Sequence, residues 1–164
     1  MVADKQVKLR GGAAIFLGVL ALLLFAYGTL NNAYFHFDAY GIAPFFAATS
    51  LILSGSMHVC CGLNGPVTMI FDAIAATLCV IAIVSVSMYV MMVKGLFRKH
   101  ATAWGKSGPP GAWVAFIAFE GFVYGLGFLV TAFSAFKALK EHQAKAQSQS
   151  TELPGVAGSG NSVV

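Results

Sequence analysis

Three ionisable side chains interrupt long apolar stretches of this sequence: His58, Asp72 and Glu120. An ionisable group placed in hydrocarbon costs a few kcal/mol, so each of the three requires a partner or a purpose. Counting about 1.5 Å of rise per helical residue puts His58 and Asp72 at matching depth on consecutive helices. We therefore expect a hydrogen bond or ion pair between them that holds the second apolar helix against the third.

Glu120 has no second acid beside it in the fourth apolar stretch. The same rise per residue places Glu120 about 12 Å from the N-terminal end of the fourth stretch, which is near the middle of a bilayer. A carboxyl group at this depth is expected to hydrogen-bond a hydroxyl group and so to link helices. A proton or cation relay is the alternative, because such relays also place an acid inside the membrane.

The elements that must position these groups are four apolar stretches, and 58% of all residues are hydrophobic while only 10% are charged. A bilayer core of roughly 30 Å requires about 20 helical residues, and each stretch reaches that length. The predicted transmembrane helices cover about residues 12–30, 43–62, 67–93 and 112–136. The predicted fold is thus an all-α integral membrane protein, a four-helix bundle with short loops over residues 12–140.

Two tails flank the predicted bundle. Residues 1–11 form a basic N-terminal tail, and residues 141–164 are rich in Gln, Ser and Gly, a composition that cannot build a core and predicts disorder. The C-terminal tail ends in Ser162, Val163 and Val164. A hydroxyl group two residues before an apolar C-terminus is the pattern that PDZ domains bind, so a cytosolic PDZ protein is a candidate partner.

Lys and Arg predict the orientation, and the net charge is +4. Six of these cations precede the first predicted helix or follow the last, at Lys5, Lys8, Arg10, Lys137, Lys140 and Lys145. The third loop carries the other four, at Lys94, Arg98, Lys99 and Lys106. The basic residues before the first helix favour both tails in the cytosol of a multi-pass protein, in the plasma membrane or a vesicle. The basic third loop either meets an acidic partner or is solvated, and cations grouped in this way favour anionic lipid headgroups over nucleic acid.

Small residues mark a helix-packing face in the fourth stretch. Gly121 and Gly125 form a Gly-xxx-Gly pair, and Gly127 lies beside it. Such a face allows two helix backbones to approach closely, either within one chain or between copies. Cys60 and Cys61 end the second stretch, where they are either acylated next to the headgroups or remain reduced thiols.

No set of Cys and His has the spacing of metal ligands, and no nucleophile with its base, phosphate loop or carboxylate pair is recognisable. We therefore expect no metal, no cofactor other than bound lipids, and no enzymatic activity.

Residues 8–140 also resemble a known family. Arg10 precedes the first stretch, an acid opens the third in Phe71-Asp72-Ala73-Ile74-Ala75-Ala76, Trp104 lies in the longer third loop, and the fourth stretch is aromatic and small. This arrangement looks like that of MARVEL-domain proteins. The resemblance implies an M-shaped four-helix fold with cytosolic ends, and a role in membrane apposition, junctions, vesicle traffic or lipid microdomains.

The expected function is a non-enzymatic scaffold that organises a membrane through helix–helix and lipid contacts. Its partners would be lipids, copies of itself or other integral membrane proteins. Two alternatives remain open. One is an accessory subunit of a larger integral membrane complex, and the other is a small oligomeric ion or proton channel that uses Glu120.

Overall fold

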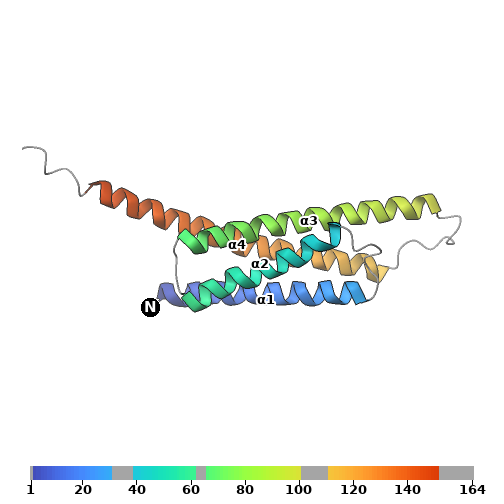
Figure 1. The fold of residues 1–164 in the computed structure, drawn as a ribbon, viewed down its shortest axis with the longest axis horizontal. Helices are drawn as coiled ribbons and strands as arrows, with labels where there is room; N and C mark the ends of the chain where they lie inside the picture. The colour runs from blue at the N-terminus through green and yellow to red at the C-terminus, as the bar shows by residue number, and fades with distance from the viewer. Residues whose placement is uncertain (1, 31–38, 62–65, 101–110, 152–164) are drawn as a thin grey trace, which may run out of the picture.

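The computed structural model describes residues 2–30, 39–61, 66–100 and 111–151, and side chains within 5–30, 42–60, 66–92 and 114–148. Four helices occupy these ranges: α1 Val2–Leu30, α2 Ala39–Cys61, α3 Pro66–His100 and α4 Gly111–Thr151 (Figure 1). All four are long and apolar enough to cross a membrane. The predicted all-helical fold with four such helices is therefore confirmed, and it is that of an integral multi-pass membrane protein.

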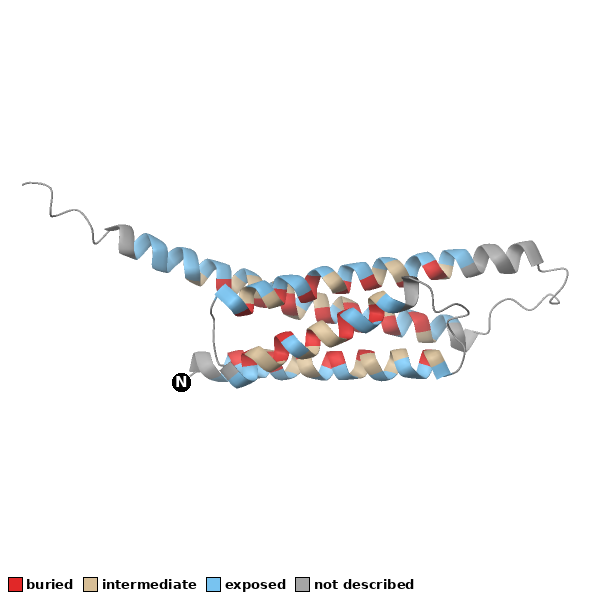
Figure 2. Cartoon of the chain, in the orientation of Figure 1, coloured by how far each residue is buried: buried red, intermediate tan, exposed pale blue. Residues whose placement is uncertain are grey.

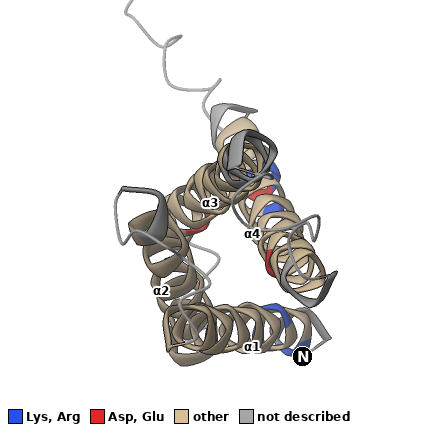
Figure 3. Ribbon diagram, turned by 90° about the vertical axis from the view of Figure 1, so that its right-hand side faces the viewer, with Lys and Arg blue, Asp and Glu red and all other residues tan. Residues whose placement is uncertain are grey.

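The helices form a closed ring in chain order. Consecutive helices run in opposite directions, and an end-on view shows α1, α2, α3 and α4 around one axis (Figures 1 and 3). The most extensive packing joins α1 to α2, α3 to α4 and α2 to α3, while α1 and α4 close the ring with less contact. The N-terminus of α1 and the C-terminus of α4 therefore lie at the same end of the bundle, called here the tail end. The opposite end is the loop end.

The distribution of polarity is the reverse of that in a water-soluble bundle. Polar and charged side chains such as Asp72, Glu120 and Thr131 are buried, whereas large apolar side chains such as Phe16, Leu23 and Phe122 are exposed (Figure 2). Exposed apolar surface on all sides is costly in water but not in lipid. The bundle thus presents an apolar coat to its surroundings and keeps its polar groups inside.

Glycines bring α1 and α2 into backbone contact. A Cβ atom on Gly55 would lie 2.5 Å from the carbonyl oxygen of Gly11, and one on Gly18 would lie 2.8 Å from the carbonyl oxygen of Ala48. These positions have no room for any side chain. Lipid gives apolar helices no hydrophobic drive to associate, so close van der Waals packing of this kind is what holds such helices together.

The centre of the ring is filled mainly by small side chains. Ala21 of α1, Ala47 and Ala48 of α2, and Ala75 and Ala82 of α3 all belong to one buried cluster. The larger members of this cluster are Leu17, Leu51, Val123 and Tyr124. Alanine positions keep the helix axes close, and the few large side chains fill the space that remains.

The helices at the tail end are longer than the sequence predicts. α1 includes most of the predicted N-terminal tail, and α4 continues through the predicted start of the disordered tail at 141 to Thr151. The N-terminal extension contains Lys, Gln, Leu and Arg, and the C-terminal one contains Ala, Gln, Lys and Glu; these residues favour helix without making a segment long and apolar. Lys137 and Glu141 add an ion pair at i, i+4, with 3.9 Å between Nζ and Oε1. Residues 152–164 lie outside the described part of the chain.

Two further boundaries differ from those predicted. α3 continues to His100, so Lys94, Arg98 and Lys99 lie on its last turns rather than in a loop. The C-terminal end of a helix is the negative end of its dipole, which favours cationic residues in the last turns. α2 begins at Ala39, so Pro44 lies inside the helix and not at its start.

The contact between α1 and α2 predicts an asymmetry between two glycine substitutions. Gly55→Ala places a methyl group against the backbone of α1 and should lower the free energy of unfolding by about 1–3 kcal/mol. Gly12→Ala is the control, because a Cβ at Gly12 meets nothing within 4 Å and should be neutral or stabilising. Unfolding of both variants in lipid nanodiscs measures the difference. Equal effects would show that the two helices are not in backbone contact.

Candidate functional site

The structure brings His58 and Asp72 together inside the bundle, as the sequence predicts. Nε2 of His58 lies 3.0 Å from Oδ1 and 2.9 Å from Oδ2 of Asp72, and both side chains are buried. The hydroxyl group of Ser54 donates a second hydrogen bond to Oδ1. Asp72 of α3 therefore accepts hydrogen bonds from two side chains of α2.

Helix geometry explains why these donors come from α2. Ser54 and His58 are four residues apart, so they lie one turn apart on the same face of the helix. Asp72 lies six residues after Pro66, the first residue of α3, and is therefore in the second turn of that helix. Two donors on one face and one acceptor opposite fix the rotation and the height of α2 against α3.

The order of the three groups is not that of a catalytic triad. In a Ser-His-Asp triad the imidazole lies between the hydroxyl group and the carboxylate, so that it can take the proton of the nucleophile. Here the carboxylate lies in the middle, and the hydroxyl group of Ser54 donates to it directly. The arrangement can hold two helices together and can hold a proton, but it does not activate Ser54.

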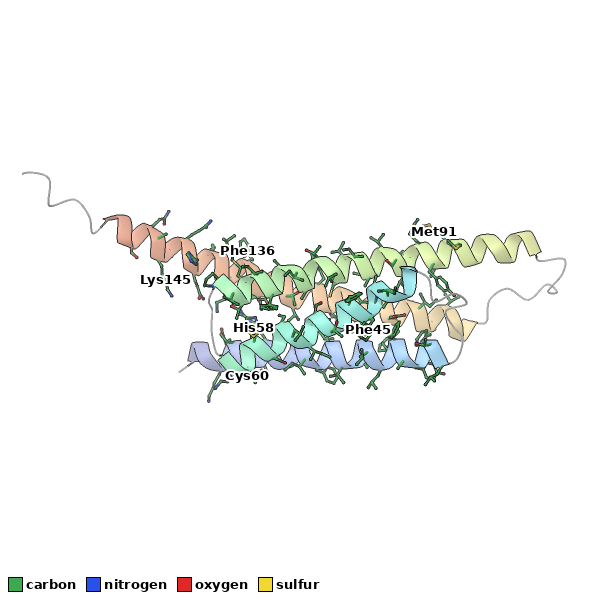
Figure 4. The ribbon with its side chains drawn as sticks, in the orientation of Figure 1. Phe45, His58, Cys60, Met91, Phe136 and Lys145 are labelled. Carbon is green, nitrogen blue, oxygen red and sulfur yellow. The ribbon has the colours of Figure 1, made fainter. Side chains whose placement is uncertain are left out.

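The other nitrogen of His58, Nδ1, is buried and has no hydrogen-bond partner among the described residues. The ring lines a small cavity at the tail end, together with Val7 and Arg10 of α1 and Ser134 and Lys137 of α4. Figure 4 shows His58 within the bundle near this end, on the side of its centre away from Phe45. Besides His58 of α2, the cavity therefore has polar side chains from two further helices, α1 and α4.

Arg10 is part of the bundle and not of a free tail. Its guanidinium lies over the ring of Phe133, 4.9 Å from the ring centroid, and so ties α1 to α4. Among the described side chains, those of Lys and Arg come from α1 and α4 (Figure 3). The tail end is thus basic on the side where α1 meets α4.

Glu120 is completely buried. Tyr124 lies one turn further along α4, close enough to interact with the carboxyl group, and its hydroxyl group donates to the carbonyl oxygen of Pro44 at 3.1 Å. This bond joins α4 to α2 across the ring. Glu120 and Tyr124 thus form a polar group inside the bundle towards the loop end.

Tyr27, Ser50 and Cys79 are further polar or thiol-bearing residues, one on each of the other three helices. Tyr27 is 60% exposed and packs its ring on Phe116, with 5.6 Å between the centroids. The hydroxyl group of Ser50 donates to the carbonyl oxygen of Ala47 in its own helix. Cys79 is buried and lies close to the backbone at Gly127.

The three glycines predicted to pack helices separate into two groups. Gly127 faces the core, since a Cβ there would lie 2.8 Å from Leu51 and 3.3 Å from the sulfur of Cys79. Gly121 and Gly125 are partly exposed, and a Cβ on either meets nothing within 4 Å. The Gly-xxx-Gly pair is therefore not used for packing within the described part of this chain.

An apolar groove of about 790 Å³ lies between α3 and α4 near the tail end. Ile70, Ala73 and Thr77 of α3 and Ala132 and Phe136 of α4 are among the residues that line it. Small side chains on both helices leave the groove open, and its size is in the range of small-molecule sites. Its chemistry suits an acyl chain or an apolar side chain.

Cys60 is exposed at the end of α2. The side chains of Cys61, Lys94, Arg98 and Lys99 lie outside the described residues, as do Lys106, Ser162 and Val164 altogether. Acylation, the basic loop and PDZ binding therefore stay predictions. Among the described residues, no group of three or more His, Cys, Asp and Glu side chains could hold a metal ion.

Several residues of the site were not predicted from the sequence. Ser54 lies four residues before His58, a spacing that could have identified it as a second donor to the same acid. Small residues spaced by seven, Gly11 with Gly18 and Ala48 with Gly55, are the corresponding signal for the contact between α1 and α2. No such signal exists for Ser134, because its approach to His58 depends on how the ring closes.

Comparison with protein-family models, with curated proteins and with solved structures found no match to this chain. The resemblance to MARVEL-domain proteins accordingly stays a prediction, and the function is inferred from the geometry alone.

The pairing of His58 with Asp72 predicts a measurable coupling. Asp72→Leu and His58→Leu each leave a buried polar group without its partner and should lower the free energy of unfolding by about 1–3 kcal/mol. Their effects should not add, and the coupling energy in the double-mutant cycle should be on the order of 1 kcal/mol, as for other polar pairs between membrane helices.

Unfolding in nanodiscs measures all four members of this cycle. Ser87→Ala is the control, because the Ser87 hydroxyl group is exposed and bonds only within its own helix, to the carbonyl oxygen of Ile83. Strictly additive effects of the two single substitutions would contradict a direct interaction.

Proposed function

We propose that this chain is a non-enzymatic scaffold that organises a membrane by associating with copies of itself and with lipids. The observation that carries the proposal is the open space beside Gly121 and Gly125, which are partly exposed. The chain uses its other close-packing glycines internally, at Gly11, Gly18, Gly55 and Gly127, and leaves this pair on its surface. A second copy of α4 is the partner that such a pair fits best.

The surroundings of this glycine pair support contact between two copies. Phe122 and Leu129 are exposed beside it, 60% and 61% respectively, and provide large apolar side chains next to the flat backbone strip. A helix that approaches Gly121 and Gly125 would pack against these side chains on either flank. Small residues with large neighbours are typical of interfaces between transmembrane helices.

The buried polar groups support the same proposal because they serve the fold. Asp72 is occupied by Ser54 and His58, and Tyr124 connects α4 to the carbonyl oxygen of Pro44. These bonds make a rigid bundle, and a rigid bundle keeps its outward faces in fixed positions. Contacts with lipid and with other chains are then the function that the outer surface provides.

Lipid contact has a specific place on this surface. The groove between α3 and α4 is almost entirely apolar and opens to the outside, so an acyl chain can lie in it beside Ala73 and Ala132. Roles in membrane apposition, junctions, vesicles or microdomains are consistent with a chain that combines lipid contact with self-association. Both tails would face the cytosol, in the plasma membrane or a vesicle.

Self-association through α4 predicts the effect of filling the glycine face. Gly121→Leu with Gly125→Leu should reduce the dimer fraction at least several-fold, because the two helix backbones can no longer approach. The bundle itself should remain folded, because there is open space beside both positions. Single-molecule photobleaching in liposomes at fixed protein density measures the fraction of dimers.

Gly12→Leu is the matched control, because Gly12 is also exposed, with open space at its Cβ, but lies on α1. This variant should associate as the unchanged chain does. Equal dimer fractions in all three proteins, or a monomer throughout, would contradict self-association through α4.

The proposed orientation predicts the accessibility of Cys60, which shares the tail end with both termini. In a chain with Cys61→Ser and Cys79→Ser, Cys60 is the remaining thiol. A membrane-impermeant maleimide should label it only after the cells are permeabilised. Labelling in intact cells would place the tails outside. Labelling that increases after hydroxylamine treatment would reveal acylation of this thiol.

A further inference from the structure

The cavity beside His58 is lined by polar side chains of three helices, and two of these side chains are cationic. It is lined by Val7 and Arg10 of α1, His58 of α2, and Ser134 and Lys137 of α4. Arg10, Ser134 and Lys137 can donate hydrogen bonds to a ligand. The tail end, where these helices meet, is also where a multi-pass bundle reaches the lipid headgroups.

His58 supplies the most specific feature of the cavity. The carboxylate of Asp72 can only accept, so Nε2 must carry a proton, and Nδ1 is the nitrogen left for a ligand. His58 is only 5% exposed, and Nδ1 has no hydrogen-bond partner among the described residues. Buried polar atoms in folded proteins are nearly always paired, so an atom of this kind indicates either an ordered water molecule or a bound ligand.

The charges around the cavity favour an anion. No acidic side chain in the described ranges forms a salt bridge with Arg10, whose guanidinium is held in place by the ring of Phe133. Lys137 has Glu141 at 3.9 Å, a long and partly exposed contact that another anion can replace. The nearest buried acid, Asp72, is already bonded to Ser54 and to the far side of His58.

We propose that this cavity binds a phosphate group. The enclosed space is about 10 Å³, roughly what one water molecule or one phosphate oxygen occupies. One oxygen would enter as a P–OH group, donate to Nδ1 of His58 and accept from the hydroxyl group of Ser134. The remaining oxygens stay at the mouth, where Arg10 and Lys137 bind them with charge-assisted hydrogen bonds.

A phospholipid headgroup and free phosphate both provide this chemistry. The headgroup would approach from the bilayer surface at the tail end, and free phosphate from the adjoining water. The site lies on the inner faces of α1, α2 and α4, away from Gly121 and Gly125 of α4. It therefore exists whether or not the chain associates with itself, and its test is independent of that proposal.

Native mass spectrometry of the full chain, released from phosphatidylcholine nanodiscs with increasing phosphatidic acid, tests the site. Arg10→Gln with Lys137→Gln should weaken phosphatidic acid binding by at least about fivefold, because two charged contacts are lost. Lys140→Gln with Lys145→Gln is the matched control. It removes the same charge from the same end, at two exposed positions outside the cavity, and should change binding by less than about twofold.

Two further probes define the ligand. Oleate carries an anionic carboxylate without phosphate and should bind much more weakly than phosphatidic acid. Inorganic phosphate at millimolar concentration should displace phosphatidic acid if free phosphate occupies the cavity, and should not if the headgroup is the ligand.

Ser134→Ala removes only one hydroxyl group from the cavity and leaves its charge unchanged. This variant should still weaken phosphatidic acid binding a few-fold.

The proposal is supported, with the lipid as the ligand, if the Arg10 and Lys137 variant loses phosphatidic acid binding and the Lys140 and Lys145 variant does not. The same variant dependence for inorganic phosphate supports it with free phosphate as the ligand. Equal losses in the two double variants would reduce the effect to general attraction between charges and overturn the proposal. Equal binding of oleate and phosphatidic acid would also overturn it.

Discussion

The carboxylate of Asp72 is the constraint on which the rest of this structure depends. An acid inside an apolar bundle requires donors, and α2 provides two of them one turn apart, Ser54 and His58. Two bonds to one carboxylate fix both the rotation and the height of α2 against α3. The same bonds engage Nε2 of His58 and so leave Nδ1 facing the cavity that Arg10 and Lys137 also line.

The position of α2 in turn determines which residues of α1 and α4 pack inside the ring. Its glycine and alanine face lies against Gly11 and Gly18 of α1, so that these two helices meet backbone to backbone. α4 closes the ring with Gly127 and Tyr124 directed inwards, and it leaves open space beside the partly exposed Gly121 and Gly125. The same packing arrangement therefore buries the polar side chains and exposes the apolar ones.

The four helices and the pair of His58 with Asp72 could be predicted, because both follow from apolar length and from rise per residue. The roles of Gly121 and Gly125 could not, because only the rotation of α4 in the assembled ring decides which face looks outwards. The position of Arg10 was missed for another reason. Residues 2–10 lack a long apolar pattern, yet they favour helix and extend α1 until Arg10 reaches Phe133.

The most direct measurement is the mass and composition of the particle that contains this chain when it is extracted from its native membrane in polymer nanodiscs. A particle that holds two or more copies of this chain, with bound lipid and no other subunit in fixed ratio, is the result expected for a self-associating scaffold. A particle with a single copy, or one dominated by other integral subunits, would contradict the account. The second result would instead make the chain an accessory subunit of a larger complex.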